Sequence, residues 1–310
     1  MESTENKNSE RILIADGDPL SRRVLANYLG RFYHVDVAEN ASQALDLVER
    51  SYEDYSVVLV TNELPPSGLQ CIARVRKDNP HLKIAFLTGS DYDSEFPLLR
   101  RYDIFTVLVR SVPFDYDELL ITIENMISPH KAMGLRRYLK LQNQCHERVI
   151  RSLADKQAMM EEALSFFRRY RPHDTDVSQI RLAFEELINN AFYHAFKRTT
   201  GEEKYEMGAF TELERGEQVV VEFGWDKNFL GCSVTDNQGT LDVDTVMRKL
   251  ERQITREGLL DERGRGLYLT RTLSDKMVIN IHPRVATQVI LLFAHKGHAK
   301  VKPLFINALG

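Results

Sequence analysis

The residues of this chain that could do chemistry are concentrated in segment 177–196 (VSQIRLAFEELINNAFYHAF). Apolar residues recur in this segment at helical spacing, which predicts a helix with one buried face. Glu186, Asn190 and His194 follow one another at four-residue intervals, so they lie along one side of that helix. A carboxylate can act as a base, and an amide oxygen suits a hard cation. Polar rows also occur on ordinary solvated helix faces, so this row alone decides nothing.

Two later segments supply more specific motifs. The apolar run 229–235 predicts a buried strand, and it ends in the polar loop 236–242 (DNQGTLD). Segment 263–269 (RGRGLYL) then opens a helix after a charged stretch. Two glycines where a loop becomes a helix let backbone N–H groups approach a phosphate, aided by the helix dipole. A helix with Glu and Asn, a strand ending in Asp-x-x-Gly, and GxGL are specific in this order, although a lone GxG is weak.

Together these segments resemble the Bergerat-type (GHKL, HATPase) ATP-binding fold and, within it, the anti-sigma-factor serine kinases. The resemblance covers about 158–294 and includes the closing strand 286–293 (ATQVILLF). It implies a C-terminal α/β sandwich of the Bergerat ATPase type, with ATP and Mg²⁺ as cofactors.

The resemblance also implies a role for each matching position. Asn190 would coordinate the Mg²⁺ that bridges the phosphates, and Glu186 would be the general base for a substrate hydroxyl. Asp236 would accept a hydrogen bond from the adenine amino group, and His194 would be structural. The other positions expected at the nucleotide are Gly239, Gly264, Arg265, Gly266 and Thr287.

Two positions depart from the family pattern. Gln238 stands where a glycine normally follows the adenine-binding Asp, and Ala286 stands where glycine is common before Thr287. If the missing glycine lets the backbone approach the base, Gln238 narrows the pocket. Segment 241–263 is expected to form a mobile lid over the nucleotide, in which Arg263 and Arg265 either contact the γ-phosphate or remain solvated.

The first half of the chain predicts a different domain. Apolar runs alternate with helix-length segments, at 11–15, 33–38, 57–60, 83–87 and 105–109. Five such strands predict a doubly wound parallel sheet that helices cover on both faces. Binding sites in these sheets lie at the carboxyl ends of the strands. The polar residues expected there are Asp16, Asp18, Thr61, Asn62, Thr88 and Arg110.

This half resembles the flavodoxin-like receiver domain of response regulators, through ILIADGDPLSRRVL, LVTNELPPSG, FLTGS and VRSVPF. A working receiver needs an acidic pair, an aspartate nucleophile and a lysine. The acidic pair has become Asp16-Gly17, the nucleophile position falls on Thr61 or Asn62, and the lysine position on Val112 or Arg110. Because aspartyl phosphorylation requires a carboxylate, we predict a pseudo-receiver that is not phosphorylated. Asp16 and Asp18 either hold a cation weakly or cap the first helix.

The predicted organisation is a pseudo-receiver at 1–130, a helical connector at 131–157 and a kinase-like ATP-binding domain at 158–310. Segment 131–170 has one glycine and no proline, which predicts one long helix or two consecutive ones. A histidine on such a helix is found in histidine kinases, but His146 lacks the proline that usually follows. It is expected to be a solvated histidine on a helix face.

Composition sets broad limits. A length of 310 residues favours two domains, and 43% hydrophobic residues supply two cores. A net charge of -4 without a basic stripe argues against direct nucleic-acid binding. Three widely spaced cysteines favour reduced thiols over a zinc site or disulfides. The sequence shows neither a signal peptide nor a membrane-spanning run, so we expect a cytoplasmic protein without membrane partners.

The resulting functional hypothesis is a protein-serine/threonine kinase in a partner-switching circuit. The resemblance implies a STAS-type anti-sigma antagonist as protein substrate, binding of a sigma factor when that substrate is absent, and a homodimer. The pseudo-receiver would regulate the kinase through contacts. The alternative is a non-catalytic anti-sigma or adaptor protein with a degenerate nucleotide pocket, and a third, weaker reading is a histidine kinase.

Overall fold

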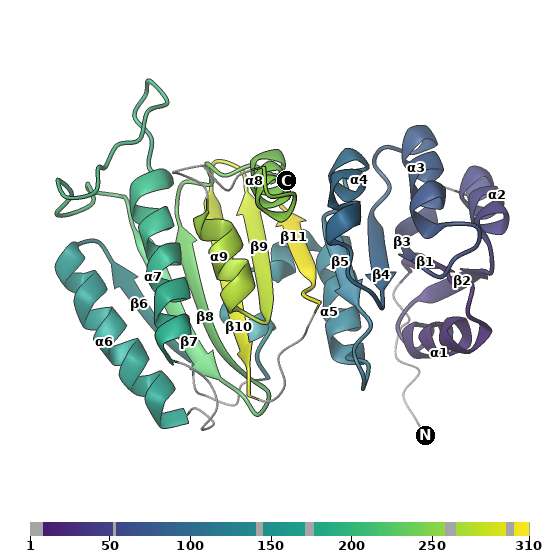
Figure 1. Ribbon diagram of the computed structural model, residues 1–310, viewed down its shortest axis with the longest axis horizontal. Coiled ribbons are helices and arrows are strands. Elements are labelled where there is room, and N and C mark those ends of the chain that lie inside the picture. The colour runs from purple at the N-terminus through teal and green to yellow at the C-terminus, as the bar shows by residue number, and fades with distance from the viewer. Residues whose placement is uncertain are drawn as a thin grey trace. The chain divides into compact units, whose positions relative to one another are not determined.

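The computed structural model describes residues 9–51, 54–140, 145–170, 177–257, 265–295 and 301–309. The chain divides into two compact units, Met1–Ser128 (unit 1) and Pro129–Gly310 (unit 2). Figure 1 labels their helices and strands and colours them by residue number. Each unit has its own buried apolar core. We therefore describe the two units separately.

Unit 1 contains five strands in the order β2-β1-β3-β4-β5, and every neighbouring pair is parallel. The residues of β4 are all buried, as expected for a parallel sheet that helices cover on both faces. This arrangement confirms the predicted doubly wound, flavodoxin-like domain. The strands are β1 Arg11–Ala15, β2 His34–Ala38, β3 Tyr55–Thr61, β4 Ile84–Thr88 and β5 Thr106–Val109.

Helices connect these strands, and three of them begin at side-chain caps. Asp18, Ser67 and Asp115 each accept a hydrogen bond from a backbone N–H of the following helix, which satisfies donors that the first turn leaves unpaired. The helices are α1 Pro19–Leu29, α2 Ala41–Ser51, α3 Gly68–Asp78, α4 Phe96–Arg101 and α5 Tyr116–Ile127, and a 3-10 turn, η2 Asp93–Glu95, precedes α4.

Unit 2 has a mixed sheet with the strand order β11-β9-β10-β8-β7-β6. Only β11 runs parallel to its neighbour β9, and the other pairs are antiparallel. The strands are β6 Cys145–Ile150, β7 Val219–Trp225, β8 Phe229–Asp236, β9 Lys276–His282, β10 Ala286–Ala294 and β11 Leu304–Ala308. The helices are α6 Leu153–Tyr170, α7 Val177–His194, α8 Val243–Ile254 and α9 Gly266–Leu273.

Helices α6, α7 and α9 lie across one face of this sheet (Figure 1), which gives the predicted α/β sandwich. Aromatic contacts identify that face. The ring centroid of Phe167 in α6 lies 6.1 Å from that of Phe223 in β7 and 6.4 Å from that of Phe184 in α7. Trp225, also on this face of β7, stacks on Tyr170 of α6 at 5.0 Å. We call it the helix face.

Two 3-10 turns, η3 Pro129–Ala132 and η4 Leu135–Arg137, contact the opposite face of the sheet. Leu135 N donates to Glu222 Oε2 at 3.0 Å. Glu222 adjoins Phe223 in β7, and consecutive strand residues point to opposite faces. The sheet of unit 2 is therefore covered on both sides.

The predicted helical connector is wrong over Cys145–Ile150, which forms strand β6 and pairs with β7. The His146 ring stacks on Phe223 at 5.0 Å, so His146 lies on a strand against aromatic side chains and not on a helix face. Helix formation starts only at Leu153. There, Ser152 Oγ accepts from Asp155 N and Asp155 Oδ2 accepts from Ser152 N, a reciprocal cap that sets the first turn.

The cap of α6 gives a test of this boundary. Asp155→Ala should lower the free energy of unfolding by about 1 kcal/mol, because the Arg151 and Ser152 N–H groups lose their acceptor. The hydrogen bond from Arg151 N is the main cause that lowers the pKa of Asp155. The contribution of the cap to the free energy of unfolding is therefore present above the ordinary aspartate pKa and is lost as pH falls through the folded-state pKa. Urea unfolding at neutral and acidic pH measures both effects. Glu161→Ala, an exposed position on the same helix, is the control, and equal losses in the two variants would contradict the assignment.

Candidate functional site

Asp236 lies at the end of β8 on the helix face and is 6% exposed. Its Oδ1 accepts hydrogen bonds from the backbone N–H of Gln238 at 2.9 Å and of Gly239 at 3.0 Å. Burial raises the pKa of Asp236, while these N–H groups act to lower it. The loop after β8 therefore holds a buried carboxyl in one orientation without any cation beside it in the part of unit 2 that the structure describes.

Thr287 of β10 is the cross-strand neighbour of Asp236. Its hydroxyl is close enough to lower the pKa of Asp236, yet Thr287 Oγ1 is buried and makes no hydrogen bond of ordinary geometry within the described ranges. A buried hydroxyl without a partner is costly. A ligand with a donor for Asp236 and an acceptor for Thr287 would satisfy both groups, and the edge of an adenine base has this chemistry. The residues present therefore fit a purine.

Gly239 fixes the loop that carries Asp236. It has a φ of +59°, and a Cβ at this position would lie 2.2 Å from His282 O and 2.7 Å from Val285 N. The loop thus packs directly on the turn between β9 and β10, which only glycine permits. Gln238 has a negative φ, so a residue other than glycine fits its backbone conformation without strain.

Helices α7 and α9 form the second part of the site. Glu186 of α7 lies against the first residue of α9: a Cβ on Gly266 would be 1.8 Å from Glu186 Oε1. Asn190 follows one turn later on the same side of α7, and both side chains are half-buried. His194 lies at the exposed end of α7 and pairs with Glu203 at 2.7 Å, which agrees with a structural role.

The expected phosphate lid is only partly described. Gly264 and Arg263 lie outside the described residues. Arg265 is the exposed N-cap residue of α9. The segment expected to begin the lid contains helix α8, which Asp242 caps through Thr245 N at 2.8 Å. The loop between β8 and α8 is tied to the end of α7, because Thr240 Oγ1 donates to Ala195 O at 2.8 Å.

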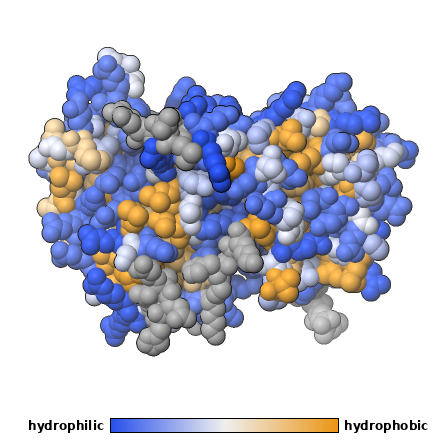
Figure 2. All heavy atoms as spheres, viewed as in Figure 1, coloured by the Kyte–Doolittle hydropathy of each residue, from blue (hydrophilic) through white to orange (hydrophobic). Residues whose placement is uncertain are grey.

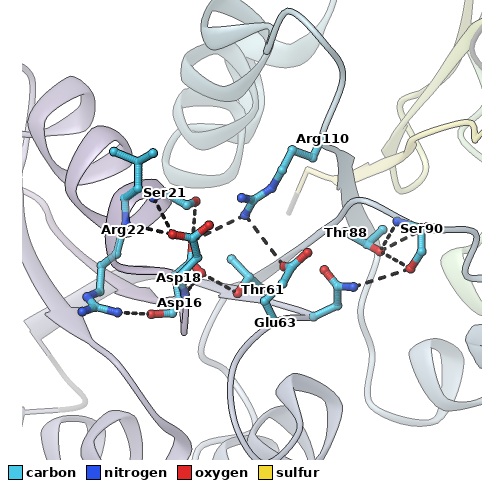
Figure 3. Close-up of polar contacts among 11 residues, drawn as sticks. Asp16, Asp18, Ser21, Arg22, Thr61, Glu63, Thr88, Ser90 and Arg110 are labelled. Atoms are coloured by element: carbon cyan, nitrogen blue, oxygen red, sulfur yellow. Dashed lines mark hydrogen bonds and ion pairs between the residues drawn. The ribbon is translucent and has the colours of Figure 1, made fainter.

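Unit 1 has its own polar site, shown in Figure 3. Asp16 at the end of β1 is fully buried, and both of its carboxylate oxygens are used. Oδ1 accepts from Asp18 N at 3.0 Å and from Thr61 Oγ1 at 3.2 Å. Oδ2 accepts from Ser21 Oγ at 2.5 Å and from Arg110 at 3.4 Å. A carboxylate offers about four acceptor positions, and these four donors occupy those of Asp16. No acceptor position of Asp16 is therefore left for a metal ion.

Arg110 supplies the positive charge that faces the Asp16 carboxylate, and Arg22 donates to the backbone oxygen of Asp16 at 2.6 Å. Arg110 also lies 3.8 Å from Glu63, whereas Val112, the other candidate for the receiver lysine, is 98% exposed. The structure thus decides between the two positions in favour of Arg110. Asp18 caps α1 by accepting hydrogen bonds from Leu20 N and Ser21 N. For Asp18, the structure thus shows helix capping, one of the two roles expected from the sequence.

The remaining receiver positions carry no carboxylate at the end of β3. Thr61 is buried and bonds Asp16, and Asn62 is half-exposed beside Glu63 and Ser90. Thr88 bonds the backbone of Ser90 and not the acidic site. Sequence reasoning missed Ser21, Arg22 and Glu63, although their place one turn into the first helix or next to the nucleophile position was a usable signal.

Comparison with known proteins identifies both units. Residues 12–124 match the family model of the response regulator receiver domain, and residues 151–292 match that of the histidine kinase-like ATPase domain. The chain therefore contains a receiver domain followed by a histidine kinase-like ATPase domain.

Individual relatives are more distant. The sensory transduction protein LytR of Staphylococcus saprophyticus is 34% identical over 85 residues, which span 26% of this chain and 33% of that protein. The 3',5'-cyclic-nucleotide phosphodiesterase regA of Dictyostelium discoideum is 29% identical over 91 residues, 28% of this chain and 11% of that protein. The match thus covers a third or less of either relative. A receiver-domain protein from Clostridium thermocellum is 22% identical with a TM-score of 0.37, covering 40% of this chain and 99% of that chain.

The described residues contain no group of three or more His, Cys, Asp or Glu side chains arranged to hold a metal ion. Among the helices that the structure describes, none is long and apolar enough to cross a membrane.

Removing the cation of the receiver site should leave the Asp16 charge buried and poorly compensated. Arg110→Met is expected to cost roughly 2 kcal/mol of stability at neutral pH, and Asp16→Asn in the same chain should recover part of it. Denaturant unfolding of the two single variants and the double variant measures this coupling. Arg181→Met, which breaks only the exposed pair with Glu185, should cost less than about 0.5 kcal/mol. Additive losses at Asp16 and Arg110 would show that the pair is not coupled.

The receiver site of unit 1 is also expected not to react with a phosphoryl donor. Incubation of the full chain with Mg²⁺ and acetyl phosphate should leave its intact mass unchanged, because neither Thr61 nor Asn62 can form an acyl phosphate. A mass gain of one phosphoryl group, lost on treatment with hydroxylamine, would disprove this.

Proposed function

We propose that this chain is a Mg²⁺- and ATP-dependent protein-serine/threonine kinase of the anti-sigma-factor type, regulated by a non-phosphorylatable receiver domain. The observation that carries the proposal is the buried pair Asp236 and Thr287, at the end of β8 and the start of β10. The carboxyl has a raised pKa, and within the described ranges the hydroxyl makes no hydrogen bond of ordinary geometry. The contact of Glu186 with Gly266 at the start of α9 supports it.

Each site residue then has a defined task. Asp236 and Thr287 hold the adenine edge, and a ligand without the exocyclic amine leaves the carboxyl unpaired. Asn190 offers an amide oxygen to Mg²⁺, and the N–H groups that open α9 at Arg265 and Gly266 face the phosphates. When bound, Mg²⁺-ATP supplies the phosphoryl group and the neutralisation of its charge.

Glu186 takes the part of the base. A serine or threonine hydroxyl of the protein substrate needs a carboxylate positioned to take its proton as its oxygen attacks phosphorus. The place of Glu186 against the N-terminus of α9 puts it beside the end of the helix where phosphate groups bind most favourably. This arrangement supports transfer to a protein hydroxyl.

The proposed setting is a cytoplasmic partner-switching circuit. The substrate would be a STAS-type anti-sigma antagonist, and the chain would bind a sigma factor when that substrate is not available. The kinase is proposed to act as a homodimer. Since Arg110 already neutralises Asp16, the receiver domain would act through its contacts and not through phosphate.

A non-catalytic adaptor remains the second candidate function. The observation that favours it is Gln238, whose side chain bonds Asn237 at 3.3 Å in the loop where the family has glycine. Partner binding without phosphoryl transfer would then be the activity of the unit. The histidine-kinase hypothesis has no support of this kind, because His146 lies in strand β6 and stacks on Phe223 of β7.

The nucleotide pocket is tested by calorimetry of the full chain with Mg²⁺-ATP. The wild type should bind in the micromolar range, and Asp236→Asn should lose binding. Since burial raises the pKa of Asp236, the ionised carboxylate costs stability at neutral pH, so the Asn variant should be at least as stable as the wild type. A loss of binding together with a large loss of stability would instead indicate misfolding. Absence of wild-type binding at millimolar ATP would favour the adaptor.

Transfer itself is tested at Glu186. Glu186→Gln should bind Mg²⁺-ATP within about threefold of the wild type and lower phosphoryl transfer to a STAS-type protein by roughly 100-fold or more. Single-turnover assays with radiolabelled ATP measure this difference. Glu185→Gln, the neighbouring half-buried carboxylate, is the control. Equal transfer by the wild type and Glu186→Gln would remove Glu186 from the reaction.

A further inference from the structure

Residues 129–140, which we call the strap, follow α5 directly in the sequence and lie on the face of the unit 2 sheet opposite the helices. The strap is held through its backbone by four side chains, which belong to β9, to β10, to β7 and to the residue that follows β7. The bonds are Asn280 Nδ2 to Ala132 O at 2.7 Å, Gly134 N to Gln288 Oε1 at 2.8 Å, Leu135 N to Glu222 Oε2 at 3.0 Å and Lys140 N to Asp226 Oδ2 at 2.8 Å.

An apolar contact adds to these bonds. Leu135 and Leu139 are buried, and a Cβ on Gly231 of β8 would lie 2.9 Å from a methyl carbon of each. The missing side chain of Gly231 therefore makes the room that these two leucines fill. The strap is fitted to this face and does not merely cross it.

The polar residues beneath the strap are unusual for the middle of a sheet. Asn280 is fully buried and Gln288 is 3% exposed, and they bond each other at 3.1 Å. Buried amides are costly unless they are hydrogen-bonded. Removing the strap would take Ala132 O from Asn280 and Gly134 N from Gln288, so the strap and this network stabilise each other.

This network adjoins the nucleotide residues directly. Gln288 Nε2 donates to Thr235 Oγ1 at 3.0 Å, which links β10 to β8 at one register pair. The next register pair is Thr287 with Asp236. Because consecutive strand residues face opposite sides, the bond beneath the strap lies one residue behind the proposed adenine contacts.

We propose that Gln288 and the strap are positioning elements for the nucleotide pocket: a docked strap holds β8 and β10 in the spacing that Asp236 and Thr287 require, and an undocked strap lowers nucleotide affinity. The strap is the segment that joins the receiver domain to the ATPase domain in the sequence. Docking and undocking of the strap would therefore let the receiver domain regulate nucleotide affinity. The effect on affinity rests on the proposed function, and the effect on the loop after β8 does not.

The test uses two matched glycines in the full chain. Gly134 has a φ of +93° and Gly208, in the loop between α7 and β7, has a φ of +88°, and a Cβ at either would meet nothing within 4 Å. Both glycines have a positive φ that alanine rarely adopts, but only Gly134→Ala strains the strap. Hydrogen exchange should be faster at the Gln238 and Gly239 amides in Gly134→Ala and unchanged in Gly208→Ala.

Nucleotide affinity is the second readout. The Kd for Mg²⁺-ATP should rise roughly fivefold or more in Gly134→Ala, and by reciprocity Mg²⁺-ATP should slow exchange of strap amides in the wild type, a response that a purely structural strap would not give. Leu139→Ala offers the same comparison if Gly134→Ala does not accumulate. Unchanged exchange at 238–239 in a folded strap variant would overturn the inference. A wild type that binds no ATP would overturn the proposed function, while exchange at 238–239 would still decide the strap.

Discussion

A strand can present its residues to only two sides, and unit 2 assigns a separate task to each side of the same strands. Along β10, Thr287 faces the helices and Gln288 faces the opposite side, and along β8 Asp236 and Thr235 divide in the same way. The proposed adenine contacts and the proposed support from the strap are thus one residue apart along each strand. This alternation explains why amides occur in the centre of a sheet whose other side is apolar and aromatic, as the Phe223 contacts show.

The two units treat a buried carboxylate in opposite ways. Asp16 is surrounded by hydroxyls, an N–H and the Arg110 guanidinium, so its charge is compensated within the protein. Asp236 faces N–H groups and the Thr287 hydroxyl but no cation within the described part of unit 2, and burial raises its pKa. A carboxylate whose acceptor positions are filled is a structural element, whereas one that is only partly satisfied has capacity for a ligand. On the face drawn in Figure 2, hydrophilic residues predominate and apolar groups are scattered among them.

Most strands were predictable because buried parallel strands are uninterrupted apolar runs, as at Arg11–Ala15, and the polar row of α7 followed from helical spacing. Strand β6 was not predictable, because its stability comes from β7, far along the chain, and its local sequence is compatible with a helix. The strap escaped notice for the same reason: the bond from Asn280 to Ala132 spans 148 positions. The choice of Arg110 over Val112 likewise required knowing which side chain turns inward.

The stack of Trp225 on Tyr170 has an optical consequence. The chain has a single tryptophan, so all indole emission originates in unit 2. Trp225 directly precedes Asp226, whose Oδ2 accepts the last strap bond, from Lys140. The indole itself lies on the helix face, against α6, so its emission reports on the packing of α6 on the end of β7, and the receiver domain contributes only tyrosine emission. Spectroscopy can in this way follow one half of the molecule without any label.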